Sequence, residues 1–217
     1  MDMANEQKSG SKTRKLVISV GVGAAIGLVT TRILGGVIES GALGSIGLSR
    51  EIAATIGLLY VIVGLMAGVG VISPKVGAKF LNVEDPEELM EQRKILFYST
   101  ISMVPLGAAL MLLAFAQPLG PVPAGVALAV LVAALIGSWW AGNRQLKLMD
   151  EMMQQVSRET AATAFYLVMT IGGGWATAAH LEYVPGPAML DWMTMFASFL
   201  LIAAFWSTGK RGLLKPR

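Results

Sequence analysis

The sequence contains no cysteine and a single histidine, His180. Disulfide bonds, thiolate nucleophiles, iron–sulfur clusters and cysteine-ligated zinc are therefore excluded, and a multi-histidine metal site cannot be built within one chain. Charge is scarce as well, because only 14% of the 217 residues are Asp, Glu, Lys or Arg, against about 25% in a soluble domain. A chain with so few charges lacks the polar surface that a globule of this size needs in water.

Apolar residues are abundant and fall in long runs. They make up 54% of the chain, and a helix that crosses the bilayer core needs about 20 mostly apolar residues. Six such runs predict an all-α polytopic membrane protein, with one six-helix membrane domain over residues 16–208. The predicted transmembrane helices cover residues 16–38, 52–73, 95–117, 122–141, 161–181 and 190–207.

The basic residues predict the orientation of these helices. Of the 17 Lys and Arg residues, 15 lie in the polar tail 1–15, in the loops after the second and fourth helices, and in the basic tail 209–217. By the positive-inside rule, both termini and these loops are cytoplasmic. The remaining loops are short and face the other side. The apolar run after the N-terminal tail lacks a clear signal-peptide cleavage site, so we expect a retained first helix.

Both longer cytoplasmic loops have the pattern of amphipathic helical linkers. Asp85 and Pro86, followed by Glu87 and Glu88, predict a helix start, and we expect this helix to run unbroken into the third transmembrane helix. Residues 145–160 place apolar side chains at spacings of three and four. Residues 87–92 and 150–155 match in character, which fits either a duplicated hairpin or two unrelated linkers.

The second linker carries a family resemblance. Met149-Asp150-Glu151, and then the run from Arg158 to Phe165, resemble a cytoplasmic helix in small uncharacterised multi-pass membrane proteins of alphaproteobacteria. The similarity covers the C-terminal third of the chain. It implies a bacterial inner-membrane location and brings no activity with it.

The fifth predicted transmembrane helix carries a polar stripe that we expect to face the interior of the bundle. Threonines recur every seven residues, each followed three positions later by a tyrosine, glycine or histidine; the stripe is Thr163, Tyr166, Thr170, Gly173, Thr177 and His180. With the glycine triplet 172–174, the stripe fits either a polar path with a hinge or a close-packed helix crossing. His180 itself is either a polar helix end or a pH-sensitive group.

Two further features lie in the predicted transmembrane helices. Arg32 is the only cation within one of them, so it needs a partner, for which Glu39 and Glu51 are the candidates; an anion or lipid headgroup is the alternative. Small-residue pairs at a spacing of four, typical of helix contacts, occur at Gly23 and Gly27 and at Gly64 and Gly68.

Motifs for catalysis are missing from the sequence. It contains no P-loop, dinucleotide fingerprint or nucleophile elbow, and no basic, aromatic-interleaved stripe for nucleic acid. We therefore expect no enzyme, cofactor, metal or nucleic-acid partner. The expected function is that of a non-catalytic accessory or structural subunit that contacts the lipid bilayer and other membrane chains or a second copy of itself. The alternative is a small transporter or channel with its path along the fifth helix.

Overall fold

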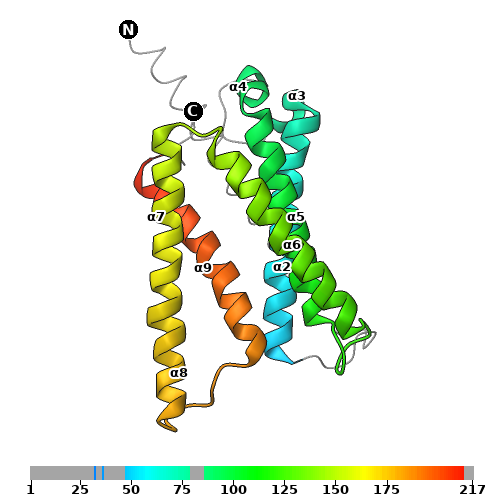
Figure 1. Cartoon of the computed structure of the whole chain (residues 1–217), viewed down its shortest axis with the longest axis vertical. Coiled ribbons are helices and arrows are strands. Elements are labelled where there is room, and N and C mark those ends of the chain that lie inside the picture. The colour runs from blue at the N-terminus through cyan, green and yellow to red at the C-terminus, as the bar shows by residue number, and fades with distance from the viewer. Residues whose placement is uncertain (1–31, 33–35, 37–46, 79–85, 213–217) are drawn as a thin grey trace.

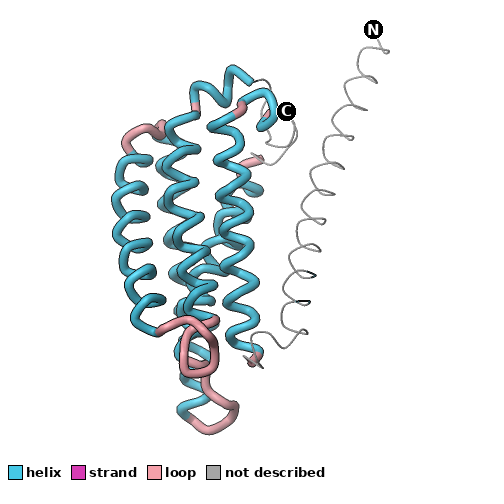
Figure 2. Tube along the Cα trace, turned by 90° about the vertical axis from the view of Figure 1, so that its right-hand side faces the viewer, coloured by secondary structure: helices cyan, strands magenta, loops and turns pink. Residues whose placement is uncertain are grey.

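The structure of the chain is a computed structural model that describes Arg32, Gly36 and residues 47–78 and 86–212. This part of the chain is helical and forms no β-sheet, which confirms the all-α class (Figures 1 and 2). The elements are α2 (Leu48–Ile72), α3 (Pro74–Gly77), α4 (Pro86–Glu91), α5 (Arg93–Ala114), α6 (Ala124–Leu146), α7 (Glu151–Leu167), the π-helix η1 (Val168–Gly172), α8 (Gly173–His180) and α9 (Met189–Lys210).

Four of these helices, α2, α5, α6 and α9, are long and apolar enough to cross a membrane. At most 22% of the apolar window of each is buried inside the protein, so many of their apolar side chains are half-buried or exposed. These four helices are compatible with a multi-pass membrane protein. The first predicted transmembrane helix, residues 16–38, lies outside the described residues except for Arg32 and Gly36. The fifth corresponds to the end of α7, η1 and α8, which follow one another as one helical column (Figure 1).

Small side chains hold α2, α5 and α6 together. Ala53 and Ala54 of α2 are fully buried against Leu110 and Ala114 of α5. Alanine and glycine allow two helix backbones to approach closely, which replaces the hydrophobic driving force that is missing in lipid. Helix α6 packs along the other side of α5.

Polar contacts join α5 and α6. The Ser138 hydroxyl donates to the carbonyl of Ser102 at 3.1 Å, and the Gln145 amide donates to Ser99 Oγ at 2.7 Å. Interhelical hydrogen bonds of this kind fix the register of neighbouring membrane helices. The C-terminal end of α6 is therefore held in place on α5.

Helix α9 is inclined to its neighbours and connects the two sides of the bundle (Figure 1). It starts beside the beginning of α2 and ends beside α7, and it packs against both helices. In the described part of the chain, the column formed by α7, η1 and α8 (the α7–α8 column) packs on the bundle only through α9.

The linker before α5 differs from the expectation. The helix that begins at Pro86 ends at Glu91, and Gln92, with φ −84° and ψ 2°, separates it from α5. The prediction of an unbroken helix into the third transmembrane helix is therefore wrong. The reason is packing: Leu89 is 1% exposed and lies beneath α3, where Gly77 leaves room for it.

The two hairpins of the suggested duplication pack differently. Helices α2 and α5 pack along their whole length, whereas α6 and α7 diverge from their connection and share no packed face among the described residues (Figure 1). The similar sequences fold differently, because residues 87–91 belong to the short α4 and residues 151–155 begin the long α7. This difference favours two unrelated amphipathic linkers over a duplication.

The helices alternate in direction, so basic residues gather at one end of the bundle. The ends of α2, α6 and α9 and the beginnings of α5 and α7 lie together at this end, which we call the basic end (Figure 1). Its described cations are Lys75, Arg93, Lys94, Arg144, Lys147, Arg158, Lys210 and Arg211. At the opposite end, the described helix termini carry Arg50.

Candidate functional site

The hydroxyl groups of the predicted polar stripe bond within their own helix. Thr170 Oγ1 donates to the carbonyl of Tyr166 at 2.7 Å, and Thr177 Oγ1 donates to the carbonyl of Gly173 at 2.8 Å. Tyr166 is 66% exposed, and His180, the last residue of α8, is exposed as well. A threonine that bonds back to its own helix satisfies its donor without a partner on another helix.

A π-turn interrupts the stripe. The π-helix η1 runs from Val168 to Gly172 and adds one residue to the turn, which rotates the following residues by about 100° relative to a regular helix. A seven-residue repeat therefore does not form one continuous face across η1. The buried residues of this column, Val156, Ala164 and Gly172, are not members of the stripe, and Gly172 lies against Trp192 and Met195 of α9. Within the described part of the chain, the stripe thus does not line the interior of the bundle.

The three adjacent glycines have different surroundings. A Cβ added to Gly172 would lie 3.1 Å from the Trp192 ring of α9. A Cβ added to Gly173 or Gly174 would meet no described atom within 4 Å. Gly172 therefore serves the contact with α9, whereas its two neighbours face open space.

Of the other predicted site residues, which are the packing glycines and the ion pair of Arg32, only some lie within the residues that the structure describes. Gly64 and Gly68 face α5, where an added Cβ would lie 2.8 Å from Val104 Cγ2 and 3.3 Å from Thr100 Cγ2, respectively. Arg32 is exposed, and within the described residues no ion pair joins it to Glu51. Gly23, Gly27 and Glu39 lie outside the described residues.

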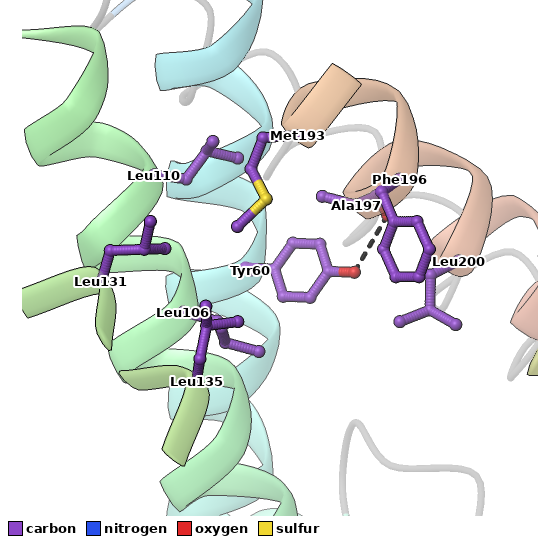
Figure 3. Close-up of a pocket in the computed structure, with 9 residues that line it drawn as sticks. All are labelled: Tyr60, Leu106, Leu110, Leu131, Leu135, Met193, Phe196, Ala197 and Leu200. Carbon is purple, nitrogen blue, oxygen red and sulfur yellow. Dashed lines mark hydrogen bonds between the residues drawn. The ribbon is translucent and has the colours of Figure 1, made fainter. Parts of the chain in front are cut away.

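A small apolar cavity lies among α2, α5, α6 and α9 (Figure 3). Its volume is about 120 Å³, and Leu, Met, Phe and Ala side chains line it together with Tyr60. The Tyr60 hydroxyl donates to the carbonyl of Ala197 on α9 at 2.9 Å, so the one polar group of the wall is already bonded. Because the lining contains no ionisable group other than this phenol, the cavity offers space for an apolar group and no acid–base chemistry.

The end of the bundle opposite the basic end contains a polar network that the sequence analysis did not find. Arg50 donates to the carbonyls of Ala114 and Ala116 at 3.2 and 2.7 Å, and so covers the C-terminus of α5. A cation at a helix C-terminus is favourable because the last carbonyls carry a partial negative charge. Asp191 accepts hydrogen bonds from the Ser49 hydroxyl and from the backbone N–H of Ala188, so it joins the beginnings of α2 and α9.

At the basic end, an ion pair joins α7 and α9. Arg211 Nη2 lies 2.6 Å from Glu159 Oε1, with both side chains partly exposed. The hydrogen bond and charge of Arg211 lower the pKa of Glu159 below its usual range. No spacing rule connects two residues on different helices, so this contact had no signal in the sequence.

The basic end also carries a cluster of aromatic and cationic side chains on α6. Trp139, Trp140, Asn143, Arg144 and Lys147 surround a hollow of about 460 Å³. Tryptophans near the end of a transmembrane helix are typical of the membrane interface. Their joint placement with two cations follows from spacings of three, four and seven residues along the helix.

The described residues contain no group of three or more His, Asp or Glu side chains placed to hold a metal ion. Comparison with protein families, with curated proteins and with solved structures finds no match to this chain. A functional interpretation therefore rests on the packing and chemistry of the chain itself.

Proposed function

We propose that this chain is a non-catalytic integral membrane protein that packs against other membrane helices as an accessory or structural subunit. The observation that carries the proposal is the open face of the α7–α8 column. In the described part of the chain, this column packs only against α9, and Gly173 and Gly174 face open space. Glycines in membrane helices admit a neighbouring backbone, so this face fits a helix of a partner chain or of a second copy.

Helix α6 supports the same interpretation. Among the described elements it packs extensively only along α5, and its other faces are exposed. A Cβ added to Gly125 or Gly137 would meet no described atom within 4 Å. The bundle therefore has two helical surfaces on which lipid or another chain can lie.

The proposal includes a topology. We place six transmembrane helices in a bacterial inner membrane, with both termini and the basic end in the cytoplasm. The gathering of basic residues at one end of the bundle supports this orientation, and the alphaproteobacterial resemblance supports the location.

The absence of cysteine allows a direct test of the topology. Single Lys147→Cys and Glu182→Cys variants place one thiol at each end of the bundle. In intact cells, we expect a membrane-impermeant thiol reagent to label the variant at position 182, and to label the variant at position 147 only after permeabilisation. The reverse pattern would refute the orientation.

The subunit role is tested by purifying the C-terminally tagged protein in mild detergent and weighing the assembly by native mass spectrometry. We expect a defined partner or a second copy. Gly173→Leu should abolish this association and leave the melting temperature of the lone chain unchanged, because the new side chain enters open space. Gly172→Leu is the matched control, which should lower the melting temperature because it meets Trp192. A monomer under all conditions would refute the proposal.

The second candidate is a small transporter or channel along the α7–α8 column. The π-turn beside the glycine triplet favours it, because π-turns often occur at functional sites and glycines allow a helix to bend. In that case, Gly173→Leu should block flux in proteoliposomes and leave the assembly intact. The subunit role is favoured if the Gly173→Leu variant no longer assembles and the unmodified protein shows no flux.

A further inference from the structure

We infer that the cluster of Trp139, Trp140, Asn143, Arg144 and Lys147 on α6 binds the phosphate of an anionic phospholipid headgroup. The five side chains surround one hollow at the basic end. This inference concerns lipid rather than a partner protein, so it does not depend on the proposed subunit role.

The cluster lies at the depth of the lipid headgroups. Arg144 follows Ala124, the first residue of α6, by 20 positions, a rise of about 30 Å, which equals the thickness of the hydrocarbon core. Trp139 and Trp140 precede it by about one turn. Indole rings favour the boundary between hydrocarbon and headgroups, so the cations extend beyond that boundary into the layer of phosphates.

The side chains of the cluster are available to a ligand. Trp139 is 73% exposed and Trp140 is 46% exposed, and Arg144 and Lys147 are exposed as well. Neither cation forms an ion pair with any carboxylate in the described ranges. By contrast, Arg211, which follows the last residue of α9, is already paired with Glu159.

The cluster is held in position before a ligand arrives. Trp140 meets the Tyr98 ring of α5 edge-on at 5.7 Å, and the Arg144 guanidinium lies over the Trp140 ring at 5.9 Å from its centre. Gln145 ties the same turn of α6 to Ser99. Less side-chain entropy is lost on binding when the binding groups are already ordered.

The charges favour an anion. The C-terminus of α6 contributes a partial charge of roughly −0.5, whereas Arg144 and Lys147 together contribute two positive charges. The net potential is therefore positive. Guanidinium and ammonium groups are the usual partners of phosphate oxygens, and the indole rings contact the glycerol and upper acyl region of the same lipid.

The experiment uses a variant in which Trp139 and Trp140 are the only tryptophans, made by Trp175→Phe, Trp192→Phe and Trp206→Phe. It is reconstituted in two kinds of phosphatidylcholine vesicle. One contains phosphatidylglycerol that is brominated near the headgroup, and the other contains phosphatidylcholine brominated at the same position and at the same mole fraction. We expect stronger quenching of fluorescence by the brominated phosphatidylglycerol. Arg144→Gln and Lys147→Gln should each weaken the apparent affinity about fivefold. Lys210→Gln, a matched control on α9, should leave the affinity unchanged.

In the fluorescence experiment, three results would overturn the inference: equal quenching by both lipids, an unchanged affinity in Arg144→Gln and Lys147→Gln, or an equal loss in Lys210→Gln. Release of the bound lipid by inorganic phosphate at matched concentration would show a general anion site and would refute the assignment to a lipid. Native mass spectrometry of the unmodified protein provides a second readout that needs no tryptophan substitution. Preferential retention of phosphatidylglycerol over phosphatidylcholine is expected, and equal retention would refute the inference.

Discussion

Gly57 of α2 and Gly107 of α5 lie backbone to backbone at the crossing of the two helices. A Cβ added to Gly107 would lie 2.4 Å from the carbonyl oxygen of Gly57, and one added to Gly57 would lie 2.7 Å from the carbonyl oxygen of Gly107. Neither atom is the end of a flexible side chain, so the helices would have to separate to accept a methyl group. This pair sets the distance between α2 and α5.

Gly107→Ala should therefore destabilise the protein by about 1–3 kcal/mol, the usual cost of overpacking. Unfolding by SDS in mixed micelles measures this change. Gly137→Ala is the matched control, because its methyl group meets no described atom within 4 Å and alanine favours a helix over glycine by about 0.5–1 kcal/mol. An equal loss of stability in both variants would contradict the role of the crossing.

The hydrogen bond from Tyr60 to Ala197 fastens α9 to α2 near the middle of the bundle. Tyr60→Phe removes the hydroxyl and keeps the ring, so we expect a loss of about 0.5–1 kcal/mol in the same unfolding assay. Tyr166→Phe removes an exposed hydroxyl and should leave the stability unchanged. An effect at Tyr166 as large as the effect at Tyr60 would contradict the role of the Tyr60 hydrogen bond.

Asp191 has two functions at the beginning of α9, since it accepts from the backbone of Ala188 and from the hydroxyl of Ser49. Asp191→Ala removes both bonds and should cost about 1–2 kcal/mol. Ser49→Ala removes only the contact between the helices, so it should cost less. Equal losses in the two variants would show that the backbone bond at the start of α9 contributes nothing.

The ion pair of Glu159 and Arg211 should make the stability depend on pH. The pKa of Glu159 is lower in the folded protein than its ordinary value of 4.5. The charged carboxylate therefore stabilises the fold fully above that value, and the contribution is lost as the pH falls through the lowered folded pKa. Glu159→Gln should melt at a slightly lower temperature than the unmodified protein at pH 7, and the difference should disappear under strongly acidic conditions.

A double-mutant cycle separates this pair from general charge effects. If Glu159 acts through Arg211, the combined Glu159→Gln and Arg211→Gln variant should melt at about the same temperature as either single variant. Additive losses would mean that the two side chains act independently.

The sequence predicted the helices that length and hydropathy define. The runs 52–73, 95–117, 122–141 and 190–207 correspond to α2, α5, α6 and α9, with ends that differ by a few residues. Apolar length is a local property, so it can be read without knowledge of the packing. The capping of α7 is local in the same way: Asp150, which accepts from the backbone N–H of Met153, marks its start.

Contacts between helices were not predictable in the same way. The prediction of the polar stripe was based on a regular helix. The π-turn of η1 changes the register of the residues that follow it, and no residue pattern predicted that turn. Two contacts join residues that are far apart in the chain: the hydrogen bond from Tyr60 to Ala197 and the ion pair of Glu159 and Arg211. Such pairs depend on the inclination of α9, which follows from the packing of the whole bundle. The crossing of α2 and α5 had a partial signal, because Gly57 precedes Gly64 by seven residues on the same helical face.

The dependence of α7 on α9 has a consequence for the synthesis of the protein. Leu167, at the end of α7, leaves the ribosome 43 residues before Lys210, at the end of α9, which corresponds to roughly 2–9 s of translation. During that interval, α2, α5 and α6 already have one another as neighbours, whereas the α7–α8 column has no described neighbour within the nascent chain. Helix α9 therefore completes the described contacts of the α7–α8 column, and until α9 emerges the column is open to capture by another membrane chain.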